Sequence, residues 1–109
     1  MEVTMKDRVA LVTGSSMGLG FAMAQRFAQS GADVALVARR EGPLLPAQEQ
    51  IQASAGGRIK TYVCDVSRKD QIEDLFASVI KDLDKVDILV NNAGAAKAGS
   101  IESVSDEEW

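Results

Sequence analysis

The 109-residue sequence predicts an α/β fold with a doubly wound parallel sheet. Four short apolar runs recur along the chain, and segments with helical periodicity lie between them. The runs are apolar throughout instead of alternating with polar residues, which is typical of strands covered by helices on both faces. A glycine-rich stretch directly follows the first run. We expect the strand order 3-2-1-4 within one structural unit, residues 1–109.

The first strand is expected at Val9–Val12, and the glycine-rich stretch Thr13–Gly20 follows it directly. Gly14 can take backbone angles that a side chain would forbid, Gly18 lets the backbone approach a ligand, and Gly20 lets the next helix pack close to the strand. The first turn of that helix would aim unpaired N–H groups and the positive end of its dipole at an anion. The stretch therefore predicts a phosphate-binding turn, and a glycine loop without a ligand is the alternative.

Apolar spacing and one glycine define the next two elements. Leu19, Met23 and Phe27 recur at helical intervals, and Gly31 is expected to stop this helix. The apolar run Val34–Ala38 is the second expected strand.

Proline and glycine set the limits of the second helix. Pro43 and Pro46 confine it to Leu45–Ala55, and Gly56-Gly57 closes it. The third strand is expected at Lys60–Cys64.

The third helix has the clearest periodicity. It is expected over Asp70–Leu83, with Ser67 as its N-cap and Asp70 in the place of the usual glutamate of a capping box. The apolar residues of one helix face are Ile72, Leu75, Phe76, Val79, Ile80 and Leu83. The fourth strand is expected at Val86–Val90.

Composition argues against several classes of function. The net charge is −4 and 46% of the residues are hydrophobic, which disfavours nucleic-acid binding and disorder. Residues 1–8 are too polar for a signal peptide, and no apolar run reaches membrane-spanning length, so we expect a cytoplasmic protein. Cys64 is the only cysteine and there is no histidine, so neither a disulfide nor a metal site is expected.

Three motifs resemble those of the short-chain dehydrogenases/reductases. Thr13-Gly14-x-x-x-Gly18-x-Gly20 follows the first strand, Cys64-Asp65-Val66 follows the third, and Asn91-Asn92-Ala93-Gly94 follows the fourth. Their order and spacing match the family's pattern, and the resemblance extends from about Lys6 to Trp109. It implies a Rossmann-like fold, a nicotinamide dinucleotide as cofactor, and interconversion of a carbonyl and an alcohol by hydride transfer.

The resemblance also implies which residues contact the cofactor. The contacts in the first loop, mainly with the pyrophosphate and the adjoining ribose, would come from Gly14, Ser16, Met17, Gly18, Leu19 and Gly20. Thr13 would mainly brace the glycine turn. Asp65 would hydrogen-bond the adenine amino group, and Val66 would pack on the adenine ring. Three residues of the last motif, Asn92, Ala93 and Gly94, would lie beside the central and nicotinamide-side riboses of the cofactor. Asn91 would hold the fourth strand to its neighbours.

Each of the later motifs also has a plainer interpretation. Taken alone, Asp65 is a turn residue and Asn91–Gly94 is only a loop. The three motifs in their order favour the cofactor site, because the loops at the carboxyl ends of parallel strands are where ligands bind.

The end of the second strand indicates which dinucleotide binds. Folds of this kind that bind NAD place a carboxylate there to accept hydrogen bonds from the ribose hydroxyls. Ala38 holds that position and Arg39-Arg40 follow, so a guanidinium would bind a 2′-phosphate that a carboxylate would repel. We hypothesise NADP(H), with Arg39 as the main contact and Arg40 assisting or stacking on the adenine. Met17 stands where related NADP-binding sequences often carry a second basic residue, and solvated surface arginines are the alternative.

No catalytic residue is expected in this chain. The family's chemistry needs a serine, and a tyrosine and a lysine in Tyr-x-x-x-Lys spacing, in which the lysine lowers the pKa of the phenol. The only tyrosine, Tyr62, lies in the third strand, and Val66 stands four residues later. Ser105–Glu108 has the pattern of a capping box at the start of a helix, and only Trp109 follows it, so we interpret the chain as the cofactor-binding half of a longer protein, or of a gene that has lost its second half.

The predicted topology leaves Ile88–Val90 on an open sheet edge, where we expect self-association. Three functions remain open at this point. The chain is a fragment of an NADP(H)-dependent oxidoreductase, a nucleotide-binding module completed by another chain, or a structural remnant that assembles and binds nothing. The motifs favour the first of these for ancestry.

Overall fold

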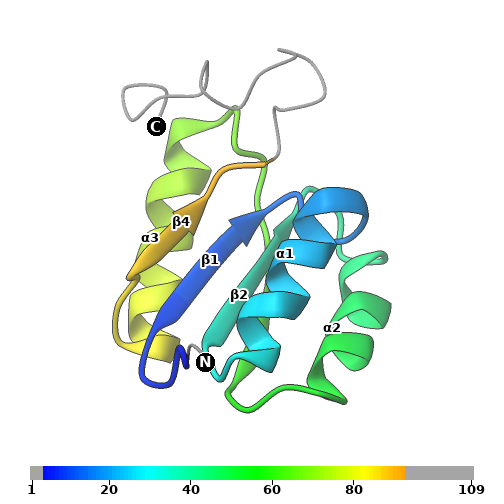
Figure 1. The fold of residues 1–109 in the computed structure, drawn as a ribbon. Helices are drawn as coiled ribbons and strands as arrows, with labels where there is room; N and C mark the ends of the chain where they lie inside the picture. The colour runs from blue at the N-terminus through cyan, green and yellow to red at the C-terminus, as the bar shows by residue number, and fades with distance from the viewer. Residues whose placement is uncertain (1–3, 93–109) are drawn as a thin grey trace.

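The computed structural model describes residues 4–92, which form a four-stranded parallel sheet with helices on both faces (Figure 1). Its elements are β1 (Val9–Thr13), α1 (Gly18–Gln29), β2 (Asp33–Ala38), α2 (Leu44–Gln52), β3 (Ile59–Val63), α3 (Lys69–Leu83) and β4 (Ile88–Val90). The strand order is β3-β2-β1-β4. The predicted fold class and strand order are therefore confirmed.

The register of the sheet brings the carboxyl ends of the strands to one edge. β1 pairs with β2 from Val9↔Asp33 to Thr13↔Val37, and with β4 from Ala10↔Ile88 to Val12↔Val90. β2 in turn pairs with β3 up to Ala38↔Val63. The loops that leave β1, β2, β3 and β4 consequently meet at this edge, where ligands bind in open α/β sheets.

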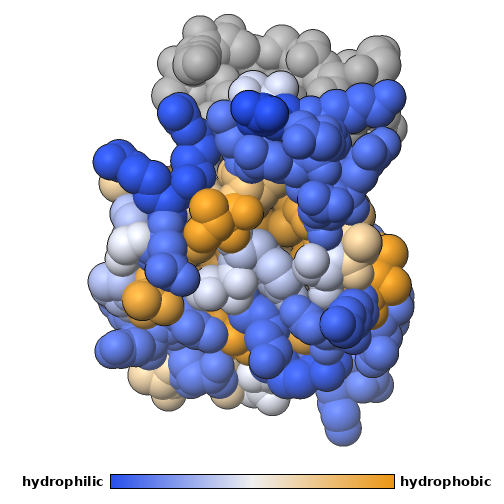
Figure 2. Space-filling model, turned by 180° about the vertical axis from the view of Figure 1, so that it is seen from behind, coloured by the Kyte–Doolittle hydropathy of each residue, from blue (hydrophilic) through white to orange (hydrophobic). Residues whose placement is uncertain are grey.

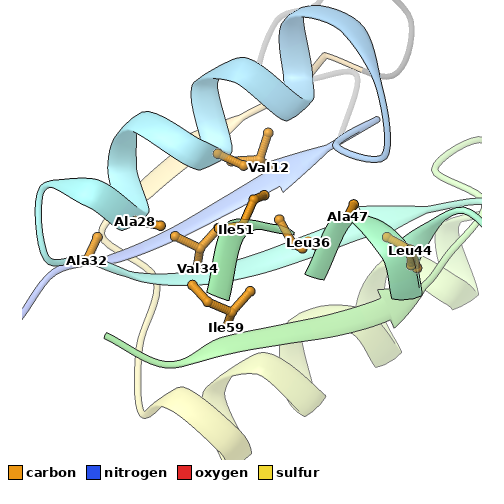
Figure 3. Close-up of a cluster of buried hydrophobic side chains, with 10 residues drawn as sticks. Val12, Ala28, Ala32, Val34, Leu36, Leu44, Ala47, Ile51 and Ile59 are labelled. Atoms are coloured by element: carbon orange, nitrogen blue, oxygen red, sulfur yellow. The ribbon is translucent and has the colours of Figure 1, made fainter. Parts of the chain in front are cut away.

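One hydrophobic core lies between the sheet and helices α1 and α2 (Figure 3). Alternate strand residues such as Val12, Val34 and Leu36 point into it. The buried residues of α1 are small, namely Gly20, Ala24 and Ala28. The helix predicted from the spacing of Leu19, Met23 and Phe27 is present, although the Leu19 side chain is 56% exposed and the other two are partly buried. Small side chains let the helix backbone lie close to the strands.

A second core lies on the opposite face, where α3 covers β1 and β2. The buried residues of α3 are Ile72, Leu75, Val79 and Leu83, and Phe76 is partly buried. Ile80 was also expected in this core, but it is 51% exposed because it lies at the margin of the covered face. Figure 2 views the molecule from this side and shows small groups of apolar residues within a largely hydrophilic surface.

The beginning of α3 corrects the predicted N-cap. Arg68 is the N-cap, with extended backbone angles, and the helix begins at Lys69, one residue before the expected start. The Ser67 hydroxyl instead donates to Asp65 Oδ1 at 2.6 Å. Ser67 therefore stabilises the turn before the helix and does not cap its first N–H groups.

Several other element boundaries also differ from the sequence-based expectation. α2 ends at Gln52, because both the N–H and the hydroxyl of Ser54 bond to the carbonyl of Ile51 and tighten the chain into a turn. β3 runs one residue earlier than expected, so Cys64 follows the strand, and β4 begins at Ile88 instead of Val86. Gly31, with φ of 102°, follows the C-cap of α1 as predicted.

Side-chain hydrogen bonds fix β4 to β1 at both ends. At the beginning, the Val9 N–H donates to Asp87 Oδ2 at 2.9 Å. At the end, the Thr13 hydroxyl donates to Asn91 Oδ1 at 3.1 Å and accepts from the Asn92 N–H at 2.9 Å. The role predicted for Asn91, which was to hold the fourth strand in place, is confirmed. Thr13 was expected to brace the glycine turn, but these bonds connect it to the end of β4.

The Asp87 hydrogen bond makes stability depend on pH. The bond from the Val9 N–H, followed by that from Lys85, holds the pKa of Asp87 below its ordinary value. The unfolded chain therefore takes up a proton first as the pH falls, so this stabilisation is complete above the ordinary carboxyl pKa and is lost as the pH falls through the lower folded value. We predict that Asp87→Asn lowers the free energy of unfolding near neutral pH and reduces its loss on acidification.

Urea denaturation near neutral pH and at about pH 3 measures this difference. Glu73→Gln, which removes an exposed carboxylate from α3, is the matched control and should change neither quantity appreciably. An unchanged acid dependence in Asp87→Asn would contradict the role given to this carboxylate.

Candidate functional site

The glycine-rich turn between β1 and α1 has the geometry of an anion site. Gly14 and Gly18 both have φ of 62°, a conformation that favours glycine. Met17 is the N-cap of α1, but its side chain makes no capping hydrogen bond, and the first turn of the helix has no acidic residue. The N-terminal end of α1 therefore presents its partial positive charge without a carboxylate to neutralise it.

Gly20 allows three segments to come together. A Cβ atom at this position would overlap the carbonyl oxygen of Gly14 and would lie 2.7 Å from Nδ2 of Asn92. The Asn92 amide also donates to the Gly14 carbonyl at 3.5 Å. The structure thus places Asn92, at the end of β4, directly beside the glycine turn.

A cleft of about 190 Å³ opens between this turn and the ends of β2 and β3. Its lining residues are Thr13, Gly14, Ser16, Met17, Val37, Ala38, Arg39, Arg40, Pro43, Cys64 and Val66. Six of the predicted site residues therefore share one cleft, although they come from three separate loops. Gly18 and Leu19 are not among the residues that line this cleft. Ala93, Gly94 and the predicted capping box at Ser105–Glu108 lie outside the residues that the structure describes.

Asp65 faces a second hollow beside the same two arginines, lined by Arg39, Arg40, Val63, Asp65 and Gln71. Its Oδ1 atom accepts hydrogen bonds from the N–H and the hydroxyl of Ser67, at 3.0 and 2.6 Å. These bonds, with the positive charge of Arg39 as a further cause, hold the pKa of Asp65 below its usual range. Asp65 is therefore an ionised turn residue, and it lies at the edge of the cleft where an adenine was expected.

Two residues that the sequence analysis did not single out shape this site. The Ser15 hydroxyl is buried and accepts the Val37 N–H at 2.8 Å, which connects the glycine turn to β2. The Gln71 side chain accepts the Asp65 N–H at 2.8 Å and so holds the turn after β3. Neither hydrogen bond can be predicted from the sequence, because each depends on which side chain faces a neighbouring strand or loop.

Tyr62 is a strand residue, as predicted. It lies in β3, and its hydroxyl donates to Asp82 Oδ2 at 2.8 Å. Burial first, and then this carboxylate, raise the pKa of the phenol well above its ordinary value. A catalytic tyrosine needs the opposite shift to exchange a proton near neutral pH.

Residues 4–92 contain no group of three acidic, cysteine or histidine side chains arranged to hold a metal ion. No helix within the same residues is long and apolar enough to cross a membrane.

A parallel sheet with a glycine-rich turn and a cleft at the carboxyl ends of its strands is the arrangement of a nucleotide-binding α/β protein. The family model described as short chain dehydrogenase matches residues 8–109. The chain therefore belongs to the short-chain dehydrogenase family. The relatives that it matches include dehydrogenases and reductases, which are oxidoreductases.

Individual relatives support the same assignment. A probable NADP-dependent mannitol dehydrogenase of Yarrowia lipolytica is 41% identical over 108 residues, which cover 97% of this chain and 38% of that protein. L-sorbose reductase from Gluconobacter frateurii, solved with NADPH and L-sorbose, has a TM-score of 0.82 at 36% identity and is matched over 100% of this chain and 41% of its own. NAD⁺-bound xylitol dehydrogenase has a TM-score of 0.76 at 31% identity, over 80% and 33% of the two chains. The chain thus spans well under half the length of these relatives.

The close approach at Gly20 gives a direct test of the site's geometry. We predict that Gly20→Ala lowers the free energy of unfolding by about 1–3 kcal/mol, because the added methyl group must displace the Gly14 carbonyl or the Asn92 amide. Urea denaturation measures the change. Gly42→Ala is the matched control, since a Cβ atom there meets no atom within 4 Å, and its effect should stay below about 1 kcal/mol. Equal effects of the two substitutions would contradict the close packing described at Gly20.

Proposed function

We propose that this chain provides the cofactor site of an NADP(H)-dependent oxidoreductase that interconverts a carbonyl and an alcohol. The observation that carries the proposal is the position of Arg39 and Arg40, which line the same cleft as the glycine turn. The bound dinucleotide would supply or accept the hydride. The residues of this chain would bind and orient it.

The local charge favours a phosphate on the ribose. Ala38 at the end of β2 carries no carboxylate, and both arginine side chains that follow are exposed to an incoming ligand. A guanidinium binds phosphate through a charge-assisted fork of hydrogen bonds. In the same cleft, the glycine turn and the N-terminal end of α1 would hold the pyrophosphate, while Val66 would pack against the adenine.

The relatives lend partial support to this choice of cofactor. The mannitol dehydrogenase is described as NADP-dependent, and the sorbose reductase was solved with NADPH. The xylitol dehydrogenase was solved with NAD⁺, so the family likeness alone leaves both cofactors open. The arginines at the end of β2 support the choice of NADP(H).

The proposed site is limited to binding. The sequence contains one tyrosine, Tyr62, and no lysine follows it at the Tyr-x-x-x-Lys spacing that the family's proton transfer uses. We therefore propose that the 109-residue chain binds the dinucleotide and does not catalyse the reaction unaided.

Substitution of Arg39 tests the cofactor choice. We expect Arg39→Ala to weaken NADPH binding by about 10- to 100-fold, because it removes charge-assisted hydrogen bonds worth about 1.5–3 kcal/mol, and to change NADH binding little. Isothermal titration calorimetry with each nucleotide measures both effects. Arg26→Ala, an exposed cation in the last turn of α1, is the control. Equal or tighter binding of NADH than of NADPH by the wild-type chain would contradict the proposal.

We also propose that the chain associates through the outer edge of β4. Within residues 4–92 this strand pairs with β1 alone, and the Leu89 side chain is 39% exposed on it. Unpaired backbone groups beside apolar side chains favour strand pairing between molecules.

Sizing with light scattering tests the association of the purified chain. We expect a dimer or a larger species at high concentration, and Leu89→Lys should shift it toward the monomer because it places a charge on the edge. Ile80→Lys is the control, since it changes an apolar side chain of similar exposure on α3. A sharp monomer peak of the wild-type chain would contradict this proposal.

A further inference from the structure

Ser15 differs from its neighbours in the glycine-rich turn. Gly14, Ser16 and Met17 line the cleft, whereas Ser15 is completely buried. Among the described residues 4–92, it and Thr13 are the two buried polar side chains. A buried hydroxyl is retained at little cost only when it is hydrogen-bonded, so its partners indicate what it holds together.

All hydrogen bonds that the structure gives Ser15 involve a single residue of β2. The Val37 N–H donates to Ser15 Oγ at 2.8 Å, and this hydroxyl is 3.4 Å from the Val37 carbonyl oxygen, to which it donates. The Ser15 N–H donates to the same carbonyl at 3.1 Å. The side chain and backbone of Ser15 thus bind both polar groups of Val37.

This contact extends the β1–β2 pairing beyond the end of β1. Thr13 is the last residue of β1 and pairs with Val37 in the register of the sheet. Gly14 then turns the chain with a φ of 62°, and Ser15 returns to the same β2 residue. The turn that carries Ser16 is therefore attached to β2 two residues before Arg39.

We infer that Ser15 is a positioning residue that sets the selectivity for a 2′-phosphorylated nucleotide. The inference rests on the proposed function. A 2′-phosphorylated nucleotide engages the glycine turn through one phosphate and Arg39 through the other, so it depends on the distance between the two loops. A nucleotide without the 2′-phosphate engages the turn alone and depends on that distance less.

The experiment compares the two half-cofactors 2′,5′-ADP and 5′-AMP, which differ in the 2′-phosphate. Affinities for each are measured by NMR titration of the wild-type chain, Ser15→Ala, Ser15→Cys and Ser54→Ala. We expect Ser15→Ala to lower the preference for 2′,5′-ADP by about tenfold, and Ser15→Cys, which keeps a weak donor and acceptor, to give an intermediate value. Ser54→Ala removes a hydroxyl that bonds to the Ile51 carbonyl after α2, and it should leave the preference unchanged.

Amide hydrogen exchange of the free chain provides a second readout. The Val37 amide should exchange faster in Ser15→Ala than in the wild type. The exchange rate of the Val34 amide, which lies in the same strand and donates to the Arg58 carbonyl, should not change. This readout requires no nucleotide and applies to either Ser15 variant that folds.

The two readouts separate the possible failures. An unchanged preference in Ser15→Ala, with both half-cofactors weakened equally, would overturn the inference and leave the proposed function intact. Equal binding of both half-cofactors by the wild type would contradict the NADP(H) proposal instead. In that case faster Val37 exchange would still support the attachment of the turn to β2, and unchanged exchange would overturn it.

Discussion

The site depends on the central position of β1 in the sheet. β1 is hydrogen-bonded to β2 on one side and to β4 on the other, and all five of its residues are buried. Because the strands are parallel and in this register, the loops after β1, β2, β3 and β4 meet at one edge. Thr13 joins the end of β1 to the end of β4, and Ser15 joins the following turn to β2. The relative positions of the cleft residues follow from these contacts.

The chemistry of the cleft follows from what this framework places there. The glycine turn has two glycines with positive φ, and the helix that follows it has no acidic residue in its first turn. Two arginines after β2 line the same cleft. Each feature favours an anion. Asp65, ionised and hydrogen-bonded to Ser67, marks the far edge of this region. The family membership and the geometry therefore lead to the same kind of ligand.

The fold class and the strand order were predictable from the sequence, because apolar runs, glycines and loop motifs are local signals. Six of the predicted site residues also line one cleft. The sequence could not show which side chains meet across loops. Ser67 is a residue type that favours the N-cap, yet its hydroxyl bonds to Asp65. Of the adjacent serines, Ser15 is fully buried and bonded to Val37, whereas Ser16 is partly buried and lines the cleft. The spacing of apolar residues predicted helix α1 but not which of its residues are buried. Close packing selected Ala24 and Ala28, and hydrophobicity alone ranks larger residues above them.

The carboxyl edge of this sheet is the proposed binding site for a nicotinamide dinucleotide. Titration of the ¹⁵N-labelled chain with NADPH, followed by two-dimensional NMR, tests it most directly. We expect the largest shift changes on the amides of residues 14–20, 39–40 and 65–66 and on Asn92, with little change at the opposite edge around Arg58 and Asp84. Shift changes confined to that opposite edge, or no shift changes at saturating NADPH, would contradict a dinucleotide site at the carboxyl edge.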